Sequence, residues 1–589
     1  MRRAILVVSI LVLSLLPVLP FVPKFWITLL NNIGISAIVA LGIVVLTGCA
    51  SITSFAQAAF VGIGAYTAAL LSMNGLSPWL ALPPSIALTA LAAYLIGLVT
   101  LRLSGHYLAL ATIAWSITLF YTFGIADFLG RFDGISGIPP VYFFGTALHD
   151  PSAFYYVIWS ALLLSILATQ NLLHTRVGRA IRALRGGRMA AEANGIDTVT
   201  ARRIAFVYAA CLAGLAGWLL AHLQRAINPT PFGLNVSIEY VLMAVVGGVS
   251  HIGGALLGSV VVTMAQDQLQ NILPRLLSTT QNFESVVFGI ALVALLQFAP
   301  QGLWPFFAKL LPVVVKGAPR DQRSSATTLP RRTMPEKGIT LLSVEGLNKS
   351  FGGLKAVREL SFELPAGAIA GLIGPNGAGK STTFNLLTGV VTADSGRINY
   401  RTQDISGWSS RNVARLGVAR TFQHVKLTPD MSVIENVALG TYLRTHAGAL
   451  QGTLALSAGE ERLAFTEAYQ MLDRVGLSAI AQEPATSLAL GQQRVVEIAR
   501  ALCLAPALLL LDEPAAGLRK GEKRQLSELL RSLRTEGITI LIVEHDMEFV
   551  MGLVDRLIVM NFGSKLAEGR PEDIRANPEV IQAYLGGAT

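Results

Sequence analysis

The sequence predicts a protein of two fold classes: an N-terminal polytopic α-helical membrane domain and a C-terminal α/β domain built around a phosphate loop. Three observations predict this. Of the 589 residues, 52% are apolar, and most of that excess precedes about residue 311. A polar stretch follows it. After that stretch, "GPNGAGKS" (374–381) stands between an apolar strand and a helical pattern.

Composition sets the expected domain boundaries. Residues 1–311 are predicted to form the membrane domain and residues 341–589 the α/β domain. Between them, residues 312–340 are rich in Pro, Ser, Thr and Arg, which is typical of a linker. The three cysteines are isolated from one another, so neither a disulfide framework nor a metal spacing is indicated.

Apolar stretches of spanning length predict about eight membrane helices. They lie near residues 4–22, 26–47, 52–73, 79–101, 107–128, 153–171, 202–222 and 284–308. The first begins after Arg2 and Arg3 and lacks a small-x-small cleavage site, so we expect it to be retained as a span. Residues 238–268 are also apolar, but "GGVSHIGGALLG" interrupts them. This predicts a broken or re-entrant segment beside a translocation path, where other helices satisfy the freed backbone groups.

The positive charge indicates orientation in a lipid bilayer and no nucleic-acid partner. The formal net charge is +10, but many arginines flank apolar spans, as positive-inside loops do. The arginines of residues 172–201 place that loop in the cytoplasm. If the α/β domain uses ATP it is cytoplasmic too, so an even number of crossings must separate residues 201 and 312. Two crossings and a re-entrant segment satisfy that requirement.

The cytoplasmic loop contains a predicted docking element. "TRVGRAIRALRGGRMAAEANGI" (175–196) reads as a basic helix, a Gly-Gly break and a short helix. Gly195 suits the left-handed cap that ends the short helix. The alanines at 190, 191 and 193 offer an apolar face that a solvated loop does not need, so we expect another surface to dock there.

The phosphate loop predicts nucleotide binding. Glycines let the chain approach a β-phosphate closely enough for backbone N–H groups to bind it. Lys380 is expected to reach the β/γ oxygens, and the Ser381 hydroxyl suits Mg²⁺. The expected nucleotide-binding residues here are Gly374, Pro375, Asn376, Gly377, Ala378, Gly379, Lys380, Ser381 and Thr382.

Two further apolar strands end in polar residues. "ALLLLDEP" (507–514) is typical of a buried strand of a parallel sheet. Asp512 at its end is predicted to hold Mg²⁺ through water, and Glu513 to act as the general base toward the attacking water. "ITILIVEHDM" (538–547) ends at His545, a candidate contact for the γ-phosphate.

Together these motifs resemble the ATP-binding cassette (ABC) family over nearly all of residues 340–589. The resemblance implies ATP and Mg²⁺ as cofactors. It also implies that Gln423 in "ARTFQ" contacts the metal and the attacking water, and that Phe351 in "KSFGG" stacks on adenine. Gly491 and Gln492 lie in "LALGQQRVVEIARAL", where the family has its signature. "FNLLTG", "DEPAAG" and the terminal "AYLGG" resemble the branched-chain amino acid import branch.

The membrane half resembles the permease of the same branch, through "SFAQAAFVGIGAYTAAL", "LRLSGHYLALATIAW" and "FAPQGL". The docking element resembles the coupling segment of ABC importers, with Met189 in the place of its Glu. The residues carried over to that segment are Met189, Ala190, Ala191, Glu192 and Gly195. The resemblance implies that it inserts into a cassette near Gln423. Whether that cassette is the chain's own or a partner's is left open.

A permease fused to its cassette implies one subunit of an ATP-driven importer of branched-chain or related small amino acids in the bacterial plasma (inner) membrane. The implied partners are a second permease and a second cassette, or a second copy of the chain, and an extracytoplasmic substrate-binding protein. The alternatives are an importer of urea, short amides or aromatic acids, an exporter, and a membrane-tethered regulatory ATPase. The broken segment argues against the regulatory ATPase, because a tether needs none.

Two positions depart from the family pattern. Ala489 stands where many cassettes have the signature Ser, whose hydroxyl bonds the partner's γ-phosphate, and Arg519 stands where an Asp or Asn is common. Loss of one such hydrogen bond costs about 1–3 kcal/mol of transition-state contact. We therefore expect the composite ATP site that this signature completes to be slower than its mate.

Overall fold

The computed structural model describes residues 16–19, 22–103, 105–277, 289–290, 293–294, 297–310 and 329–585. The chain divides into two compact units, taken separately below. The N-terminal unit comprises residues 1–174 and 199–316, and the C-terminal unit comprises residues 175–198 and 317–589. The segment 175–198, which lies between two membrane helices in the sequence, therefore packs as part of the C-terminal unit.

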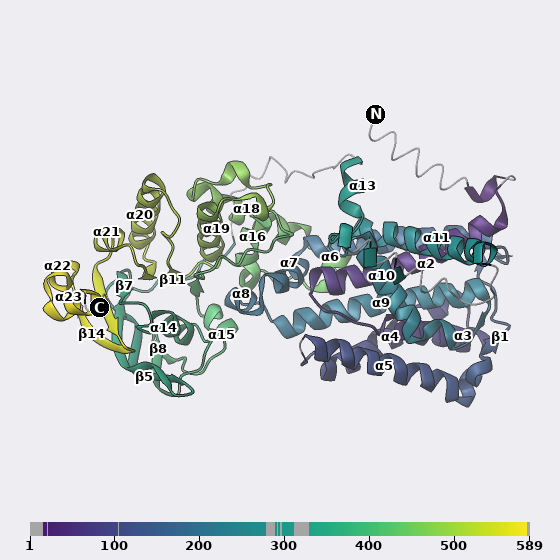
Figure 1. Ribbon diagram of the computed structural model, residues 1–589, viewed down its shortest axis with the longest axis horizontal. Coiled ribbons are helices and arrows are strands. Elements are labelled where there is room, and N and C mark those ends of the chain that lie inside the picture. Colours follow the sequence, from purple (N-terminus) through teal and green to yellow (C-terminus); the bar gives the residue numbers. More distant parts are fainter. Residues whose placement is uncertain are drawn as a thin grey trace. The chain divides into compact units, whose positions relative to one another are not determined.

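The N-terminal unit is a helical bundle in which α2 packs on α6, α10 and α11, and α3 packs on α4 (Figure 1). Its main helices are α2 (Lys24–Ile43), α3 (Gln57–Met73), α4 (Pro78–Thr100), α5 (His106–Ile125), α6 (Pro151–His174), α9 (Thr198–Gln224), α10 (Leu234–Gly247), α11 (Ile252–Leu277) and α13 (Trp304–Leu310). A π-helix, η2 (Val44–Cys49), continues α2. The strands β1 (Ile135–Ser136) and β4 (Ala226–Ile227) pair, as do β2 (Tyr142–Phe143) and β3 (Thr146–Ala147).

Burial separates a central helix from peripheral ones. In the most apolar stretch of α2 with η2, 83% of the residues are buried, against 28% in α4 and in α5. The exposed residues of α4 and α5 include many large apolar side chains, such as Leu91, Leu95, Leu110 and Ile117. An exposed face this apolar is suited to lipid rather than to water.

The expectation of about eight spans is wrong for the residues that the structure describes. They contain five helices long and apolar enough to cross a membrane, or up to six if a bent pair counts as one span. Residues 52–73 contribute only the 17-residue α3, because residues 51–56 are not helical. Most of the expected span 4–22 lies outside the described residues, as does most of the predicted linker. In the expected span 284–308, residues 284–288, 291–292 and 295–296 lie outside them.

The predicted break in residues 238–268 is confirmed. α10 and α11 are bent by 118° at the intervening loop, where Gly248 has a φ of +116°. The glycines also let the two backbones touch. A Cβ on Gly258 would lie 1.7 Å from the Met243 carbonyl oxygen, and one on Gly247 would lie 1.8 Å from that of Gly254. Larger residues at these two positions would force the helices apart.

The C-terminal unit contains two sheets. The six-stranded sheet has the order β10-β11-β12-β7-β13-β14 and is parallel except for the β13–β14 pair. Its strands are β7 (Ile369–Ile373), β10 (Val418–Arg420), β11 (Leu508–Asp512), β12 (Thr539–Val543), β13 (Arg556–Asn561) and β14 (Ser564–Gly569). β11 and β12 pair in parallel, and every residue of β7, β11 and β12 is buried, so the buried parallel strand predicted for residues 507–514 is confirmed.

The second sheet is antiparallel, with the order β6-β5-β8-β9. Its strands are β5 (Thr340–Phe351), β6 (Leu354–Pro365), β8 (Ser395–Tyr400) and β9 (Gln403–Asp404). The helices of the unit include α14 (Lys380–Leu387), α15 (Ser410–Arg415), α16 (Val433–Ala438), α17 (Ala449–Thr453), α18 (Ala458–Arg474), α19 (Leu490–Leu502), α20 (Lys520–Thr535), α21 (Met547–Met551), α22 (Pro571–Ala576) and α23 (Pro578–Leu585). A 3₁₀ segment, η8 (Leu439–Arg444), follows α16.

The segment 175–198 folds as the sequence predicts, into a basic helix and a short helix. These are α7 (Arg176–Ala183) and α8 (Arg188–Ala193), joined by the 3₁₀ turn η5 (Leu184–Gly186). Gly195 has a φ of +79°, as expected of the residue that caps α8.

Candidate nucleotide site and docking segment

A pocket of about 430 Å³ gathers residues from distant parts of the C-terminal unit. Its lining includes most of the residues expected to bind or hydrolyse a nucleotide: Phe351, Asn376, Gly377, Ala378, Gly379, Lys380, Ser381, Thr382, Gln423, Glu513 and His545. The Phe351 ring at the pocket edge is 49% exposed. An exposed aromatic face there is free to stack on a flat ligand.

The phosphate loop joins β7 to α14 and depends on its glycines. Gly379 has a φ of +98°, and a Cβ there would lie 2.4 Å from the Ala356 carbonyl oxygen. The Lys380 ammonium donates to the carbonyl oxygens of Gly374 and Pro375, at 2.7 and 2.9 Å. Burial lowers the pKa of Lys380, and nearby carboxylates oppose that shift. A lysine so placed is held by its own loop until an anion competes for it.

Glu513 is the centre of a polar cluster in the pocket. Gln423 Nε2 donates to Glu513 Oε1 at 2.9 Å, and His545 Nε2 lies 3.2 Å from the same oxygen. The Glu513 backbone is in the left-handed region, at φ +49°, and its N–H donates to the Val543 carbonyl oxygen at 2.8 Å. The three residues that the sequence predicts to be catalytic thus converge on one carboxylate oxygen.

Asp512 lies beside this cluster but is buried, with a relative exposure of 2%. Within the described residues its Oδ1 has no hydrogen-bond partner, while Oδ2 lies 3.7 Å from the Arg420 guanidinium. Burial raises the pKa of Asp512, and the positive charge of Arg420 opposes that rise. A buried carboxylate oxygen without a partner fits a hard cation such as Mg²⁺, which also suits the hydroxyl of Ser381 in the pocket lining.

Arg420 is a site residue that sequence reasoning missed. Its side chain is 5% exposed and donates to Asn385 Oδ1 and Thr388 Oγ1, both at 2.8 Å. These contacts fix the guanidinium next to Asp512. The available signal was its position three residues before Gln423, at the end of β10 in the same parallel sheet.

Sequence reasoning also missed three charged residues on one side of α19. Arg494 donates to the backbone carbonyl oxygens of Glu513 and Gln423, at 2.6 and 3.1 Å. Glu497 accepts from the Lys426 N–H at 2.8 Å, and Arg500 donates to the Lys426 carbonyl oxygen at 2.9 Å. Their spacing of three among the apolar residues Val495, Val496, Ile498, Ala499 and Ala501 was the signal. The three charged residues attach α19 to the segment that carries Gln423.

The signature residues lie apart from the pocket. Gly491 and Gln492 line a separate hollow, whose other walls include α20. The Gln492 side chain accepts from the Ala489 N–H at 3.2 Å, so it caps the start of α19. Arg519 precedes α20, and its N–H donates to Glu522 at 2.7 Å. The part these residues would play toward a second cassette stays a prediction.

α8 presents the expected face. Ala190 and Ala191 are buried, whereas Met189 is 56% exposed, and α8 packs on α15. Glu192 accepts from Arg188 at 2.7 Å and from the Thr198 hydroxyl at 2.9 Å. It therefore links the first residue of α8 to the first residue of α9.

Two glycines place this segment against the rest of the unit. A Cβ on Gly195 would lie 2.3 Å from the Leu443 side chain of η8. A Cβ on Gly186 would lie 3.4 Å from Thr428 Oγ1 and 3.7 Å from the carbonyl oxygens of Lys426 and Leu427. The turn before α8 therefore lies directly on the segment that follows Gln423.

Comparison with known proteins gives the family. Residues 25–296 match a family described as the permease component of the branched-chain amino acid transport system. Residues 357–516 match the ABC transporter family, and residues 564–589 a family described as the branched-chain amino acid ATP-binding cassette transporter. The high-affinity branched-chain amino acid transport ATP-binding protein LivG of Salmonella typhimurium is 47% identical over 251 residues, which are 42% of this chain and 98% of that protein. The chain belongs to the branched-chain amino acid ABC transporter family.

Two further transport ATP-binding proteins agree with this membership. LivG of Escherichia coli K12 is also 47% identical, and BraF of Pseudomonas aeruginosa 43% identical, over the same shares of both chains. A crystal structure of a nucleotide-free cassette from an ABC transporter is 32% identical, with a TM-score of 0.38, and aligns with 42% of this chain and 99% of that chain. The chain is thus a permease domain and an ATP-binding cassette of this family in one polypeptide.

Proposed function

We propose that the chain is one permease–ATPase subunit of a binding-protein-dependent importer of branched-chain or related small amino acids. The observation that carries the proposal is the presence, in one chain, of a permease match and a cassette whose relatives are named for branched-chain amino acid transport. The site geometry supports the hydrolytic half, because Gln423, Glu513 and His545 converge in the pocket that holds the phosphate loop.

ATP would bind with its adenine on Phe351 and its phosphates on the N–H groups of the loop and the Lys380 ammonium. Glu513 would accept a proton from a water molecule as the water oxygen attacks the γ-phosphorus and the bond to the β-phosphate oxygen breaks. Gln423 would orient that water. His545, which touches the same carboxylate oxygen as Gln423, would contact the γ-phosphate.

Mg²⁺ would neutralise the charge that develops on the phosphate oxygens. Ser381, Gln423 and Asp512 would hold it, directly or through water. Asp512 is prepared for this role by its buried Oδ1, which has no hydrogen-bond partner among the described residues, and the positive charge of Arg420 favours the ionised form that a cation requires.

Closure around ATP would reach the docking segment through hydrogen bonds and close contacts within the C-terminal unit. Arg494 ties α19 to Gln423 and Glu513, and Glu497 and Arg500 tie it to Lys426. The Lys426 carbonyl oxygen in turn lies close to Gly186, 3.7 Å from where a Cβ would be. A change at the γ-phosphate would therefore move α7 and α8, and with them the permease helices α6 and α9 that the segment joins in the sequence.

The working assembly would contain a second permease and a second cassette, or a second copy of the chain, and an extracytoplasmic substrate-binding protein. It would lie in a bacterial inner membrane with the cassette in the cytoplasm. The arginines of α7 on the cassette side agree with that orientation.

The test is ATP hydrolysis by the complex reconstituted in liposomes, with no additive, with binding protein, and with binding protein and leucine. We expect leucine-dependent stimulation that disappears in Glu513→Gln. Glu579→Gln, at an exposed position on α23, is the matched control and should behave as wild type. Hydrolysis indifferent to binding protein and to every amino acid would contradict the proposal. Stimulation by urea, an amide or an aromatic acid instead would reassign the substrate.

A further inference from the structure

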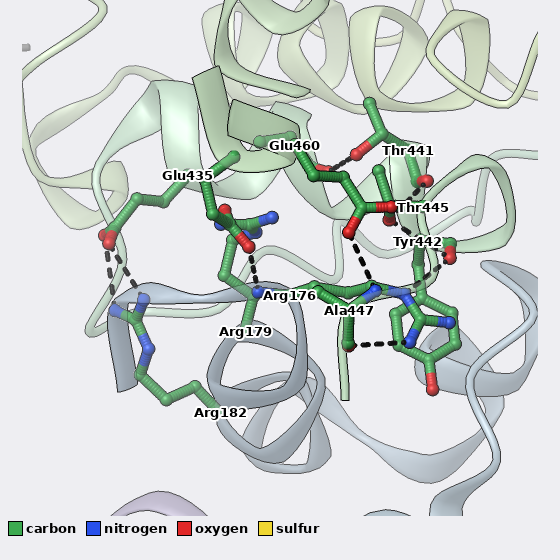
Figure 2. A network of polar contacts seen from close by, with 11 residues as sticks. Arg176, Arg179, Arg182, Glu435, Thr441, Tyr442, Thr445, Ala447 and Glu460 are labelled. Carbon is green, nitrogen blue, oxygen red and sulfur yellow. Dashed lines mark hydrogen bonds and ion pairs between the residues drawn. The ribbon is translucent and has the colours of Figure 1, made fainter. Parts of the chain in front are cut away.

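A row of arginines on the docking segment meets a row of acids. Arg176, Arg179 and Arg182 recur every third residue of α7, so they share one side of that helix (Figure 2). Arg185 follows on η5. Their partners come from three elements of the cassette. Arg179 pairs with Glu461 at 2.5 Å, Arg182 with Glu435 through two hydrogen bonds of 2.8 and 3.2 Å, and Arg185 with Asp430.

The first arginine binds differently. The Arg176 guanidinium lies 3.9 Å from the centre of the Tyr442 ring and donates to the carbonyl oxygens of Tyr442 and Ala447, at 3.0 and 3.3 Å. Its backbone N–H donates to Glu461 at 2.5 Å. A planar guanidinium can stack and donate at once, which a lysine ammonium cannot.

Two of the acids lie at helix starts, and one of them, Glu435, is also held by its own helix. Glu435 lies in the first turn of α16, where its carboxylate accepts from the Ser432 N–H at 3.0 Å and completes a capping box. Glu461 lies in the first turn of α18. Its neighbour Glu460 accepts from the Ala447 N–H, which positions the carbonyl that receives Arg176. The N-terminal ends of helices also favour negative charge.

The sign of the charge reverses at the other end of the segment. There Asp197, beyond α8, pairs with Arg411 of α15 at 2.6 Å. A surface with arginines at one end and an acid at the other fits only a cassette with the complementary order. Because the side chains of Arg179 and Arg182 are only 2% and 10% exposed, a cassette lacking the acids would take a carboxylate partner away from each of these two buried charges.

We propose that this charge pattern, formed by Arg179, Arg182, Arg185 and Asp197, assigns the permease to its own cassette rather than to the cassette of another chain. All four pairs form within one polypeptide and inside one compact unit. The proposal rests on the proposed function, since it names the partner of the coupling segment. It implies that the second half of the assembly brings both a docking segment and the cassette that the segment fits.

A cross-link tests the pairing without requiring transport. In a full chain whose Cys49, Cys211 and Cys503 are replaced by Ala, Gly186→Cys and Thr428→Cys place two thiols at a point of contact. Oxidation in membranes should give a disulfide within a monomer, seen as a shift in mobility on a non-reducing gel. A cross-linked dimer, or no cross-link, would overturn the proposal.

The matched control moves one thiol. Gly186→Cys combined with Gly459→Cys, in the same cysteine-free background, should not cross-link, because no heavy atom lies within 4 Å of a Cβ at Gly459. This assay gives its answer whether or not the chain transports leucine. It therefore separates a failure of the pairing from a failure of the proposed function.

Charge exchange tests selectivity. Asp197→Arg and Arg411→Asp should each reduce leucine uptake about tenfold, and the two changes in one chain should restore most of it. Arg182→Glu with Glu435→Arg repeats the test at the other end, with yield and gel filtration as folding controls. The two single variants co-expressed as separate chains should not complement each other. Complementation between chains, or no rescue within one chain at either pair, would overturn the proposal.

Discussion

The nucleotide pocket and the docking surface of α7 are both built from charged side chains, but they satisfy those charges differently. In the pocket, Lys380 donates to carbonyl oxygens of its own loop, and Asp512 keeps an oxygen without a hydrogen-bond partner among the described residues. On the docking surface, Arg179 and Arg182 are buried against carboxylates. The first arrangement is ready for a ligand, whereas the second is complete. Changes in the pocket should therefore alter rates, and changes on the docking surface should alter stability.

The sharpest test of the pocket is Glu513→Gln. We expect hydrolysis to fall by about 10²–10⁴, the range that a general base contributes. Nucleotide affinity and the unfolding temperature should stay at wild-type values, because the amide keeps an oxygen for Gln423 and His545. Steady-state hydrolysis, nucleotide titration and thermal unfolding measure the three quantities. A matching loss of thermal stability would erase the distinction between the two regions.

The docking surface should respond in the opposite way. Arg179→Met removes the guanidinium that pairs with Glu461, whose side chain is only 13% exposed and keeps the Arg176 N–H as a donor. We therefore expect a loss of about 3–5 kcal/mol in the free energy of unfolding. Arg185→Met is the control within the same row. Its pair with Asp430 is about one third exposed and should contribute under about 1 kcal/mol. Denaturant unfolding compares the two variants. Equal losses would show that burial does not set the strength of these pairs.

The pH dependence of ATP hydrolysis tests whether Arg420 acts on Asp512. Burial raises the pKa of Asp512, and Arg420 opposes that rise, so removing the guanidinium in Arg420→Met should raise this pKa further. A carboxyl that holds its proton to higher pH binds Mg²⁺ less well at low pH. We therefore expect the acid limb of the hydrolysis profile to move to higher pH, by about one unit. Arg420→Lys keeps the charge and should move the limb less. An unchanged limb in both variants would mean that Arg420 does not act on Asp512.

The smallest expected effect tests the close fit of α8. Gly195→Ala introduces a Cβ at φ +79°, within 2.3 Å of the flexible Leu443 side chain. We expect a loss of about 1–2 kcal/mol in the free energy of unfolding, partly from the backbone and partly from the contact. Leu443→Ala should reduce the cost of the added methyl group. If the glycine substitution costs the same in both backgrounds, the strain lies in the backbone alone.

The cassette was more predictable than the membrane unit, for physical reasons. "GPNGAGKS" and "LLLLDE" carry both their structure and their chemistry within a few residues, so strand, loop and functional group follow together. The break at "GGVSHIGG" was equally local. The span predicted over residues 52–73 was too long, because apolar composition does not reveal that residues 51–56 are not helical.

The arginines of α7 show what local sequence cannot supply. Their presence suggested a cytoplasmic loop, but Arg182 and Glu435 are 253 residues apart, and no pattern pairs them. Arg420 escaped notice for a related reason. It reads as one more residue of a strand end, and only the sheet order places it beside Asp512.

The bend between α10 and α11 carries a consequence for motion. Where Gly258 meets the Met243 carbonyl oxygen and Gly247 meets that of Gly254, backbone lies on backbone with no side chain between them. Two helices that meet through leucine side chains can adjust gradually, because those side chains can change rotamer. The backbone contact between α10 and α11 has no side chain that could adjust in this way. The corner behaves as a stiff joint that either stays closed or separates as a whole. In a membrane protein that changes shape, this pair would travel as one rigid piece, and the helices around it would supply the movement.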